Sequence, residues 1–453
     1  MSAPALAAAD GVPLHARPGD ATEVSRTSRL RSICGGSLGN LIEYYDWFTY
    51  ASFALYFAPA FFPGAERTTQ LLNTSGIFAL GFLMRPVGAW LLGRAADRYG
   101  RKPTLIASVS LMCLGSTMIA VTPGYSRIGL WAPALLVAAR MLQGLSVGGE
   151  YGTSATYLAE IAPGDRRGFW ASFHLVTTIL GQLLALSVLL VLRFVLFDEA
   201  QIESWAWRLP FALGAALAIA VFYIRRGIAE APEFLSKRGA SGARSGVPEL
   251  LKHRRIVLLA FGMSVGSNVA YYSLTTYMQK YLVASVGFSI GQASAICTAG
   301  LLIFAVAQPA AGWVSDMIGR KPVLLCFGVG GTLLTVPLMT LIGRTHDPLA
   351  AFGLSGALLL MLAGGTSISA TVKAEMFPAV VRTLGVGLPF AITQSIFAGT
   401  AEYIALSFKT LGHESGFFWY VSGCITISLI TFLYVPETRW SSQMTVVDMP
   451  ARR

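Results

Sequence analysis

Charged side chains interrupt the long apolar stretches of this sequence. Glu43 and Asp46 lie three residues apart and would share one face of a helix, while Arg85 and Arg140 each occur in another apolar run. A charge at the centre of a bilayer costs at least about 3 kcal/mol, so such residues are functional candidates. Burial favours the neutral form of a carboxyl group and lets it carry a proton. We therefore expect proton transfer at Glu43 and Asp46, with a structural ion pair or helix–helix hydrogen bond as the alternative.

Arg85 has the chemistry to hold a carboxylate. It lies nine residues before Arg94, about 13.5 Å along a helix, and Glu43 lies twelve residues, about 18 Å, past Arg31. The two side chains are therefore at comparable depth. A guanidinium stays charged when buried and matches a carboxylate with two hydrogen bonds. We expect Arg85 to bind a substrate carboxylate, or to pair with Glu43 or Asp46 when the site is empty. A permanent structural pair is the alternative.

Arg140 and Glu150 are further candidates for proton coupling. Arg140 could pair within the first half of the chain and tune the neighbouring carboxyl groups, although a purely structural role fits its position equally well. Glu150 could be a second proton site. Its neighbours Gly148, Gly149 and Gly152 first indicate close helix packing.

The expected substrate cavity needs polar and aromatic walls. Candidates for its lining are Tyr44, Tyr271, Tyr272, Asn268 and Lys373. Aromatic side chains in apolar stretches also pack without any ligand, and Lys373 could instead extend its ammonium group to water. The five cysteines are single and lack metal-ligand spacing, so we expect no metal and no cofactor other than the proton.

The composition requires lipid around much of the chain. Hydrophobic residues make up 54% of it and charged residues only 13%, about half of the roughly 25% of a soluble domain. A membrane-spanning helix needs about 20 apolar residues. Twelve stretches of the required kind predict an all-α integral membrane protein, with spans at 33–60, 70–92, 103–122, 130–159, 169–196, 208–226, 256–283, 290–312, 322–343, 349–372, 384–408 and 415–435.

The basic residues alternate between the two sides of these spans. With the N-terminus inside, 24 Lys and Arg residues lie on the cytoplasmic side and seven on the other side. This asymmetry predicts that both termini are cytoplasmic, and it explains the net charge of +11 without nucleic acid as a partner. The expected organisation is a disordered tail over 1–29, a six-helix bundle over 30–226, a cytoplasmic linker over 227–255, a second six-helix bundle over 256–438 and a tail over 439–453.

Two sequence motifs occur once in each half. A Gly-x-x-x-Asp-x-x-Gly-Arg-Lys run follows the second and the eighth span, and a Glu-x-x-Pro-x-x-x-Arg run follows the fourth and the tenth. Motifs repeated in the same order indicate duplication, as is common in transporters. We expect their charged residues to form a gate that breaks when the halves rock. These residues are Asp97, Arg101, Asp316, Arg320, Glu160, Arg167, Glu375 and Arg382.

The loop motif is the signature of the major facilitator superfamily, and the run 39–48 around Glu43 and Asp46 resembles its metabolite:proton symporter family. The runs 81–86, 144–157, 275–282, 373–378 and 401–403 are most similar to the α-ketoglutarate carriers of that family. One departure is Tyr99, where those carriers lead us to expect His. The resemblance covers about residues 30–435 and implies twelve transmembrane helices in two pseudo-symmetric six-helix bundles.

The resemblance implies proton-coupled import of α-ketoglutarate or a related dicarboxylate by a monomer in the inner membrane. Moving a dianion against 100 mV, inside negative, costs about 4.6 kcal/mol, which favours proton symport. A symporter of the same family for shikimate, citrate, proline or betaine is the close alternative. A membrane enzyme is not expected, since no Walker loop or histidine-rich metal cluster occurs. A sensor would usually need a signalling domain beyond the spans.

Overall fold

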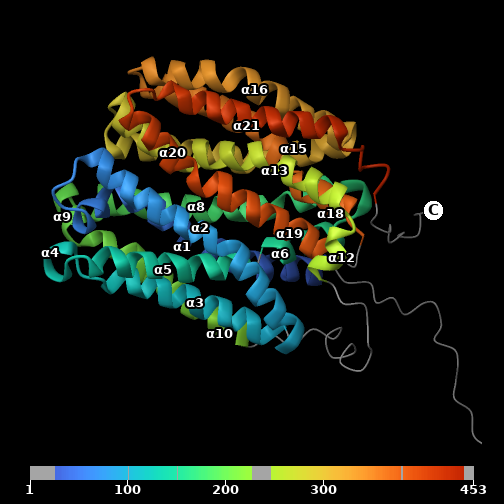
Figure 1. Ribbon diagram of the computed structural model, residues 1–453, viewed down its shortest axis with the longest axis horizontal. Helices are drawn as coiled ribbons and strands as arrows, with labels where there is room; N and C mark the ends of the chain where they lie inside the picture. Colours follow the sequence, from blue (N-terminus) through green and yellow to red (C-terminus); the bar gives the residue numbers. More distant parts are fainter. Residues whose placement is uncertain (1–25, 100, 150, 227–245, 379–380, 443–453) are drawn as a thin grey trace, which may run out of the picture.

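The computed structural model describes residues 26–99, 101–149, 151–226, 246–378 and 381–442, and every regular element within these ranges is helical. The helices run side by side along one direction (Figure 1). Helices α3, α5 and α10 lie at one edge of the bundle and α16 and α21 at the other, with the remaining long helices between them.

The first half of the described chain, residues 26–226, begins with two helices that are longer than a bilayer requires. Its elements are α1 (Arg26–Phe61), α2 (Arg67–Tyr99), α3 (Arg101–Val121), α4 (Tyr125–Ile128), α5 (Trp131–Gly148), α6 (Tyr151–Ile161), η1 (Gly164–Arg166), α7 (Arg167–Ala171), α8 (Phe173–Val191), η2 (Leu192–Leu196), α9 (Glu199–Ser204), η3 (Ala206–Arg208) and α10 (Leu209–Arg226). Because α1 begins at Arg26, the prediction of a disordered tail over 1–29 is wrong for its last four residues.

The second half, residues 246–442, contains α12 (Val247–Leu251), α13 (Arg254–Tyr272), η4 (Ser273–Tyr277), α14 (Met278–Tyr281), η5 (Leu282–Val286), α15 (Ile290–Ile318), α16 (Arg320–Arg344), α17 (Pro348–Thr366), α18 (Ser369–Met376), α19 (Arg382–Thr393), η6 (Gln394–Ala398), α20 (Gly399–Thr410) and α21 (Ser415–Tyr434). Helix α12 lies inside the range predicted as a linker. The elements η4 and η6 are π-helical turns, and each interrupts a span that the sequence predicts as one helix.

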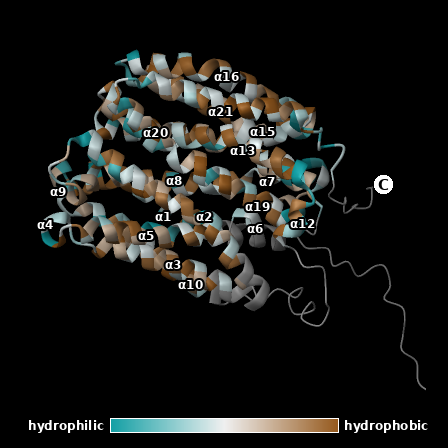
Figure 2. Cartoon of the chain, in the orientation of Figure 1, coloured by the Kyte–Doolittle hydropathy of each residue, from teal (hydrophilic) through white to brown (hydrophobic). Residues whose placement is uncertain are grey.

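The helical surface suits lipid. Nine helices of the described chain are long and apolar enough to cross a membrane, and α3 contributes a shorter apolar stretch, Ile106–Val121. Hydrophobic residues cover the middle of the helices, and hydrophilic residues gather at the helix ends and connections (Figure 2). Large side chains such as Trp90, Trp131, Val306 and Leu349 are more than half exposed, which water would penalise and lipid does not.

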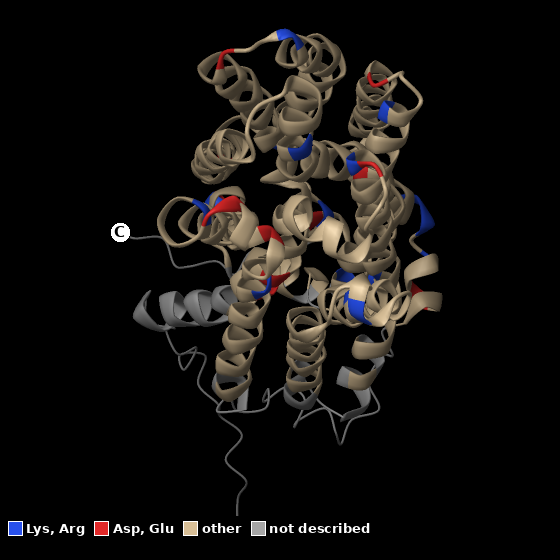
Figure 3. Cartoon of the chain, turned by 90° about the vertical axis from the view of Figure 1, so that its left-hand side faces the viewer, with Lys and Arg blue, Asp and Glu red and all other residues tan. Residues whose placement is uncertain are grey.

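The two ends of the bundle differ in the motifs that they carry. The motif end contains α6, α12 and α18, with the Glu-x-x-Pro motifs, and lies on the right in Figure 1. The far end contains α4 and α9 and lies on the left. Seen from the far end, most of the described chain carries neither acidic nor basic residues (Figure 3).

Glycines let α2 and α5 touch through their backbones. A Cβ atom on Gly144 would overlap the carbonyl oxygen of Gly81, and one on Gly148 would overlap the carbonyl oxygen of Arg85. Gly152 of α6 likewise lies against Gly387 of α19, at a contact between the two halves. The interpretation of the glycines near residue 150 as packing residues is therefore confirmed, and their packing fixes the depth at which α2 holds Arg85.

We predict that Gly148→Ala lowers stability by about 1–3 kcal/mol, because the added methyl group has no room at the α2–α5 contact. The matched control is Gly353→Ala in α17, where nothing lies within 4 Å of the added Cβ. That control should be neutral or slightly stabilising, since Ala favours a helix by up to about 1 kcal/mol over Gly. Thermal loss of the monodisperse peak in detergent measures both. Equal stability of the two variants would contradict the packing argument.

Candidate functional site

Arg85 lies at the centre of the bundle as a buried cation. It is 2% exposed, and its Cζ atom lies 4.1 Å from the ring centroid of Trp47 and 4.3 Å from that of Phe82. One Nη atom donates to the side-chain oxygen of Gln394 in η6, which belongs to the other half. Its Nε and its second Nη have no partner among the described residues. Arg85 therefore has two donors to offer to an anion.

Aromatic side chains from both halves surround this guanidinium. The ring of Tyr272 lies 5.0 Å from Phe82 and 5.3 Å from Tyr271, and the charge of Arg85 acts on the hydroxyl groups of Tyr44 and Tyr272. The Tyr271 hydroxyl donates to Gln182 of α8 at 3.4 Å. The structure thus brings Tyr44, Tyr271 and Tyr272 into one aromatic cluster beside Arg85, and that they line a substrate cavity stays a prediction.

Lys373 is a second buried cation in this region. It is fully buried in α18, its Nζ atom has no partner among the described residues, and it lies 5.1 Å from the Phe390 ring centroid. Extension of the ammonium group to water is therefore ruled out as its arrangement. Phe390 and Gln394 are one helical turn apart, about 6 Å along the axis. Arg85 and Lys373 therefore approach the same helix at neighbouring turns.

Asn268 lies close to the same turn of this helix. Its Nδ2 atom donates to Thr393 Oγ1 at 3.1 Å, one residue before the glutamine that holds Arg85. Both side chains are buried. The predicted set around Arg85 is thus brought together from α1, α2, α13 and α18 against α19 and η6.

The carboxylate of Asp46 contacts α3 and α5 of the first half. Its carboxylate accepts from the Ser116 hydroxyl and from Gln143 Nε2 at 2.6 Å, and Gln143 Oε1 accepts from Arg140 at 2.6 Å. The amide of Gln143 therefore bridges Asp46 to Arg140, and all three residues are completely buried. The prediction that Arg140 acts within the first half agrees with this arrangement.

One aromatic ring joins the two arginines. The Arg140 guanidinium carbon lies 4.1 Å from the Trp47 centroid, the same distance as that of Arg85. A desolvated cation–π contact is worth about 2 kcal/mol. A displacement of either arginine therefore changes the surroundings of the other.

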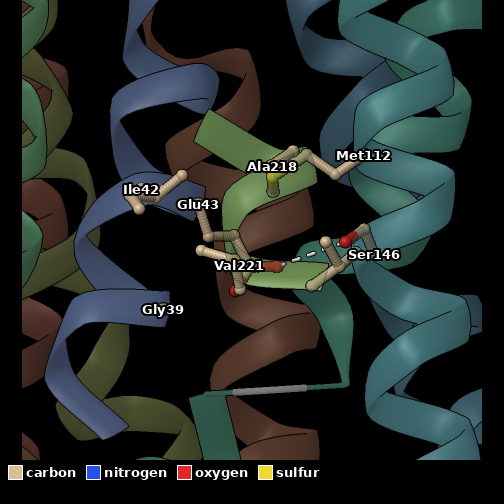
Figure 4. Close-up of a pocket in the computed structure, with 8 residues that line it drawn as sticks. Gly39, Ile42, Glu43, Met112, Ser146, Ala218 and Val221 are labelled. Atoms are coloured by element: carbon tan, nitrogen blue, oxygen red, sulfur yellow. Dashed lines mark hydrogen bonds between the residues drawn. The ribbon is translucent and has the colours of Figure 1, made fainter. Parts of the chain in front are cut away.

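Glu43 faces the interior of the first half. Ser146 donates to its carboxylate at 3.3 Å, and both residues line a cavity of about 10 Å³, large enough for about one water molecule. Ala218 and Val221 of α10 close this cavity (Figure 4). Asp46 binds Ser116 and Gln143, and Arg85 donates to Gln394 of the other half, so the described conformation does not show the expected pairing of Arg85 with Glu43 or Asp46. Glu150 lies outside the described residues.

Repeated charged residues tie the halves together at the motif end. Arg167 contacts Glu375 at 3.5 Å, and Arg382 donates to Glu160 at 2.8 Å, so each arginine of the repeated motif meets the glutamate of the other half. Arg320 also contacts Glu375 at 3.5 Å.

Asp316 adds a second kind of contact at this end. It accepts from the backbone N–H groups of Gly168 and Phe169 at 2.9 and 2.8 Å, and from Arg320 at 2.6 Å. The motif at the end of the eighth span is therefore hydrogen-bonded to the start of the fifth span. The side chains of Asp97 and Arg101 lie outside those that the structure describes.

Residues after the last span complete this network, and sequence reasoning missed them. Glu437 accepts from the backbone N–H groups of Arg320 and Lys321 at 2.9 Å and so caps α16, which follows Gly319 without a side-chain cap of its own. Thr438 donates to Glu375 at 2.6 Å. Because Gly319 cannot cap α16 with a side chain, the first N–H groups of this helix need an acceptor from elsewhere. The sequence does not indicate which residue provides it.

Comparisons with known proteins agree with this architecture. Residues 34–250 and 245–447 match the family described as "Sugar (and other) transporter". An alpha-ketoglutarate permease of Escherichia coli (strain K12) is 48% identical over 405 residues, which are 89% of this chain and 93% of that protein. A proline/betaine transporter of Salmonella typhimurium is 31% identical over 438 residues, 93% of this chain and 86% of that one.

A structural neighbour supports the same fold. The major facilitator superfamily proton:xylose symporter XylE, bound to 6-bromo-6-deoxy-D-glucose, superimposes with a TM-score of 0.72 at 20% identity, covering 93% of this chain and 98% of that chain. At this level of identity the likeness concerns the fold alone. From the matched segments and the relatives together, the chain belongs to the sugar (and other) transporter family, and is thus a multi-pass membrane transporter and not an enzyme.

Proposed function

We propose that the protein imports α-ketoglutarate, or a closely related dicarboxylate, together with protons. The observation that carries this proposal is the pair of buried cations, Arg85 and Lys373, neither of which has a carboxylate partner among the described residues. A buried charge without a counter-ion is costly, and an anionic ligand removes that cost. The relative that is 48% identical is an alpha-ketoglutarate permease, which supports the same substrate.

The spacing of the two cations suits a ligand with an acid group at each end. Arg85 contacts Gln394, and Lys373 lies over Phe390, one turn away on the same helix. α-Ketoglutarate carries two carboxylates at the ends of a five-carbon chain. In the proposed complex Arg85 forms two hydrogen bonds to one carboxylate, Lys373 neutralises the other, and Tyr44, Tyr271, Tyr272 and Asn268 surround the oxo acid between them.

The proposed architecture is twelve membrane-crossing helices in two six-helix bundles, with the motif end and both termini in the cytoplasm and the protein in the inner membrane. The excess of Lys and Arg on the motif side supports this orientation. We expect a monomer in the lipid bilayer, with protons as the coupling ions, no other cofactor and no nucleic-acid partner.

The proposed proton sites are the carboxyl groups of the first half, Glu43, Asp46 and Glu150. Asp46 is connected to the substrate site through Gln143, Arg140 and Trp47. A proton on Asp46 removes the negative charge that attracts Arg140 across the bridging amide of Gln143. Arg140 then interacts differently with the ring that it shares with Arg85, so proton binding and substrate binding affect each other.

Transport proceeds by alternating access. The Arg167–Glu375 and Arg382–Glu160 contacts hold the motif end closed, and separation of the halves there breaks both. At the far end Ser75 of α2 donates to Glu402 of α20, so the halves also meet above Arg85. The two halves are therefore in contact at both ends of the described conformation.

A zwitterion is the second candidate substrate, because the aromatic cluster at Arg85 also suits a quaternary ammonium group. A solute panel decides between the two. In proteoliposomes with an imposed pH gradient, unlabelled α-ketoglutarate should inhibit uptake of labelled α-ketoglutarate better than citrate, shikimate, proline or glycine betaine. A zwitterion that competes better than every dicarboxylate would reject the dicarboxylate proposal.

We predict that Arg85→Ala lowers uptake at least 100-fold without loss of membrane insertion. Two charge-assisted hydrogen bonds at about 1.5–3 kcal/mol each account for this loss. Arg85→Lys should restore little of the uptake, because an ammonium group cannot form the bidentate hydrogen bonds that a guanidinium forms to a carboxylate. Arg193→Ala, at a partly exposed pair with Glu199, is the matched control and should transport normally. Normal uptake by Arg85→Ala would remove the substrate role of this residue.

Lys373→Met should reduce the preference for a dicarboxylate over a monocarboxylate of the same length. With one cation lost, the affinity for α-ketoglutarate should fall at least tenfold, while that for 2-oxopentanoate should change little. Competition curves for the two acids measure this preference. An equal loss for both acids would mean that Lys373 supports the fold and not the second carboxylate.

Asp46→Asn should uncouple uptake from the pH gradient. The amide cannot take up a proton, so accumulation driven by the gradient should disappear, whereas exchange of internal for external substrate, which needs no net proton movement, should remain. Asp165→Asn is the control, since Asp165 is largely exposed at the motif end. If Asp46→Asn still accumulates substrate with the gradient, the proton site lies elsewhere.

A further inference from the structure

A buried ion pair lies at the far end of the bundle above Arg85. Glu402 of α20 is 4% exposed and Lys280 of α14 is 1% exposed, and their charged groups lie 2.6 Å apart. The same carboxylate oxygen, Oε1, accepts both from Lys280 and from Ser75 of α2. The other oxygen, Oε2, is buried without a partner among the described residues.

The neighbours of Glu402 leave Lys280 as its only charged partner in the described chain. Two other titratable groups face it, Tyr50 of α1 and Tyr277 of η4. The Tyr50 hydroxyl donates to the carbonyl oxygen of Thr74, and the Tyr277 hydroxyl donates to a second carboxylate, Glu414. Neither hydroxyl satisfies Oε2. A proton on Glu402 would therefore leave the Lys280 ammonium without a counter-ion.

The connectivity of the pair determines what happens when the far end opens. Lys280 and Glu402 both belong to the second half, whereas Ser75 belongs to the first. Opening breaks the Ser75–Glu402 hydrogen bond and separates α2 from α20, but it leaves the ion pair intact. In that state the pair faces the water on the outer side of the membrane, from which both the proton and the substrate arrive.

The pair also lies on the path to the proposed substrate site. Glu402 is eight residues beyond Gln394, which holds Arg85, so it is about 12 Å nearer the outer face along the same helix. While Glu402 is ionised, it neutralises Lys280 and repels a dianion. Once Glu402 is protonated, the site carries the positive charge of Lys280.

We propose that Glu402 and Lys280 form an outer entry site at which one proton and one substrate carboxylate bind together. The inference rests on the proposed import of an organic dianion. A proton from the outer water adds to Oε2 of Glu402, and Lys280 stays an ammonium group and transfers its ion pairing from Glu402 to the carboxylate of the ligand. No covalent bond to the ligand forms or breaks. The proton therefore binds before the anion, and the pair imposes that order on uptake.

The test compares the external-pH dependence of uptake in wild type and Glu402→Gln, reconstituted in proteoliposomes with a fixed internal pH. The probe is α-ketoglutarate. In wild type the KM should rise at least tenfold between external pH 5.5 and 8. Glu402→Gln keeps an acceptor for Ser75 but is never ionised, so its log KM should rise less steeply with pH than that of wild type. Its reversal potential should also indicate one proton fewer per substrate.

Matched variants separate this role from a structural one. Glu414→Gln changes the neighbouring carboxylate at the far end and should keep the slope of wild type. Lys280→Met should raise the KM at least tenfold at every pH. If a single variant does not fold, the double variant Lys280→Met/Glu402→Met, which leaves no unpaired charge, should fold and show the raised KM together with the shallower slope.

The outcomes distinguish this inference from the proposed function. If wild type takes up α-ketoglutarate and Glu402→Gln keeps its pH slope and its stoichiometry, the entry site is rejected and the proposed substrate stands. A wild type that transports no dicarboxylate rejects both. A shallower slope in Glu402→Gln but not in Glu414→Gln supports the entry site.

Discussion

Two buried guanidinium groups share one indole ring, and the other elements of the site are arranged around this contact. Arg85 and Arg140 each lie 4.1 Å from the Trp47 centroid, where the ring offers both some compensation for lost water. Each arginine is also held by a neutral amide, Gln394 for one and Gln143 for the other. Neutral amides bind these cations without cancelling their charge. The centre of the bundle therefore stays positive, and it has one contact to the second half and one to Asp46.

The halves meet differently at the two ends of the bundle. At the motif end the contacts between the halves join opposite charges, Arg167 with Glu375 and Arg382 with Glu160. Opening that end separates the buried Arg167–Glu375 pair, which is costly, and also the Arg382–Glu160 pair, in which the glutamate is exposed. At the far end Ser75 donates an uncharged hydroxyl to Glu402 of the other half, Tyr403 lies beside Gly76, and the Lys280–Glu402 ion pair stays within one half. Among the described residues, opening the far end therefore separates hydrogen-bonded and apolar contacts rather than ion pairs.

The sequence predicts the helices well, because long apolar runs and repeated motifs have few other solutions in lipid. It also predicts that the charged motif residues form a network, but not that each motif arginine meets the glutamate of the other half, and the roles of these residues and of those near Arg85 stay predictions. The sequence does not predict which of several polar neighbours a buried side chain binds. Asp46 binds Ser116 and Gln143, and because both residues are uncharged, the sequence does not indicate that they are its partners. The π-helical turns η4 and η6 likewise have no local sequence signature that separates them from ordinary helix.

The cap that Glu437 provides for α16 also bears on the biosynthesis of the protein. The first N–H groups of that helix are satisfied by a residue 117 positions later in the chain, and Thr438 supplies the second contact of Glu375. Helix α16 and the gate glutamate are therefore made long before their partners leave the ribosome. Until residues 437–438 emerge, the motif end lacks these bonds, so its network of contacts is completed only after the last span has been made.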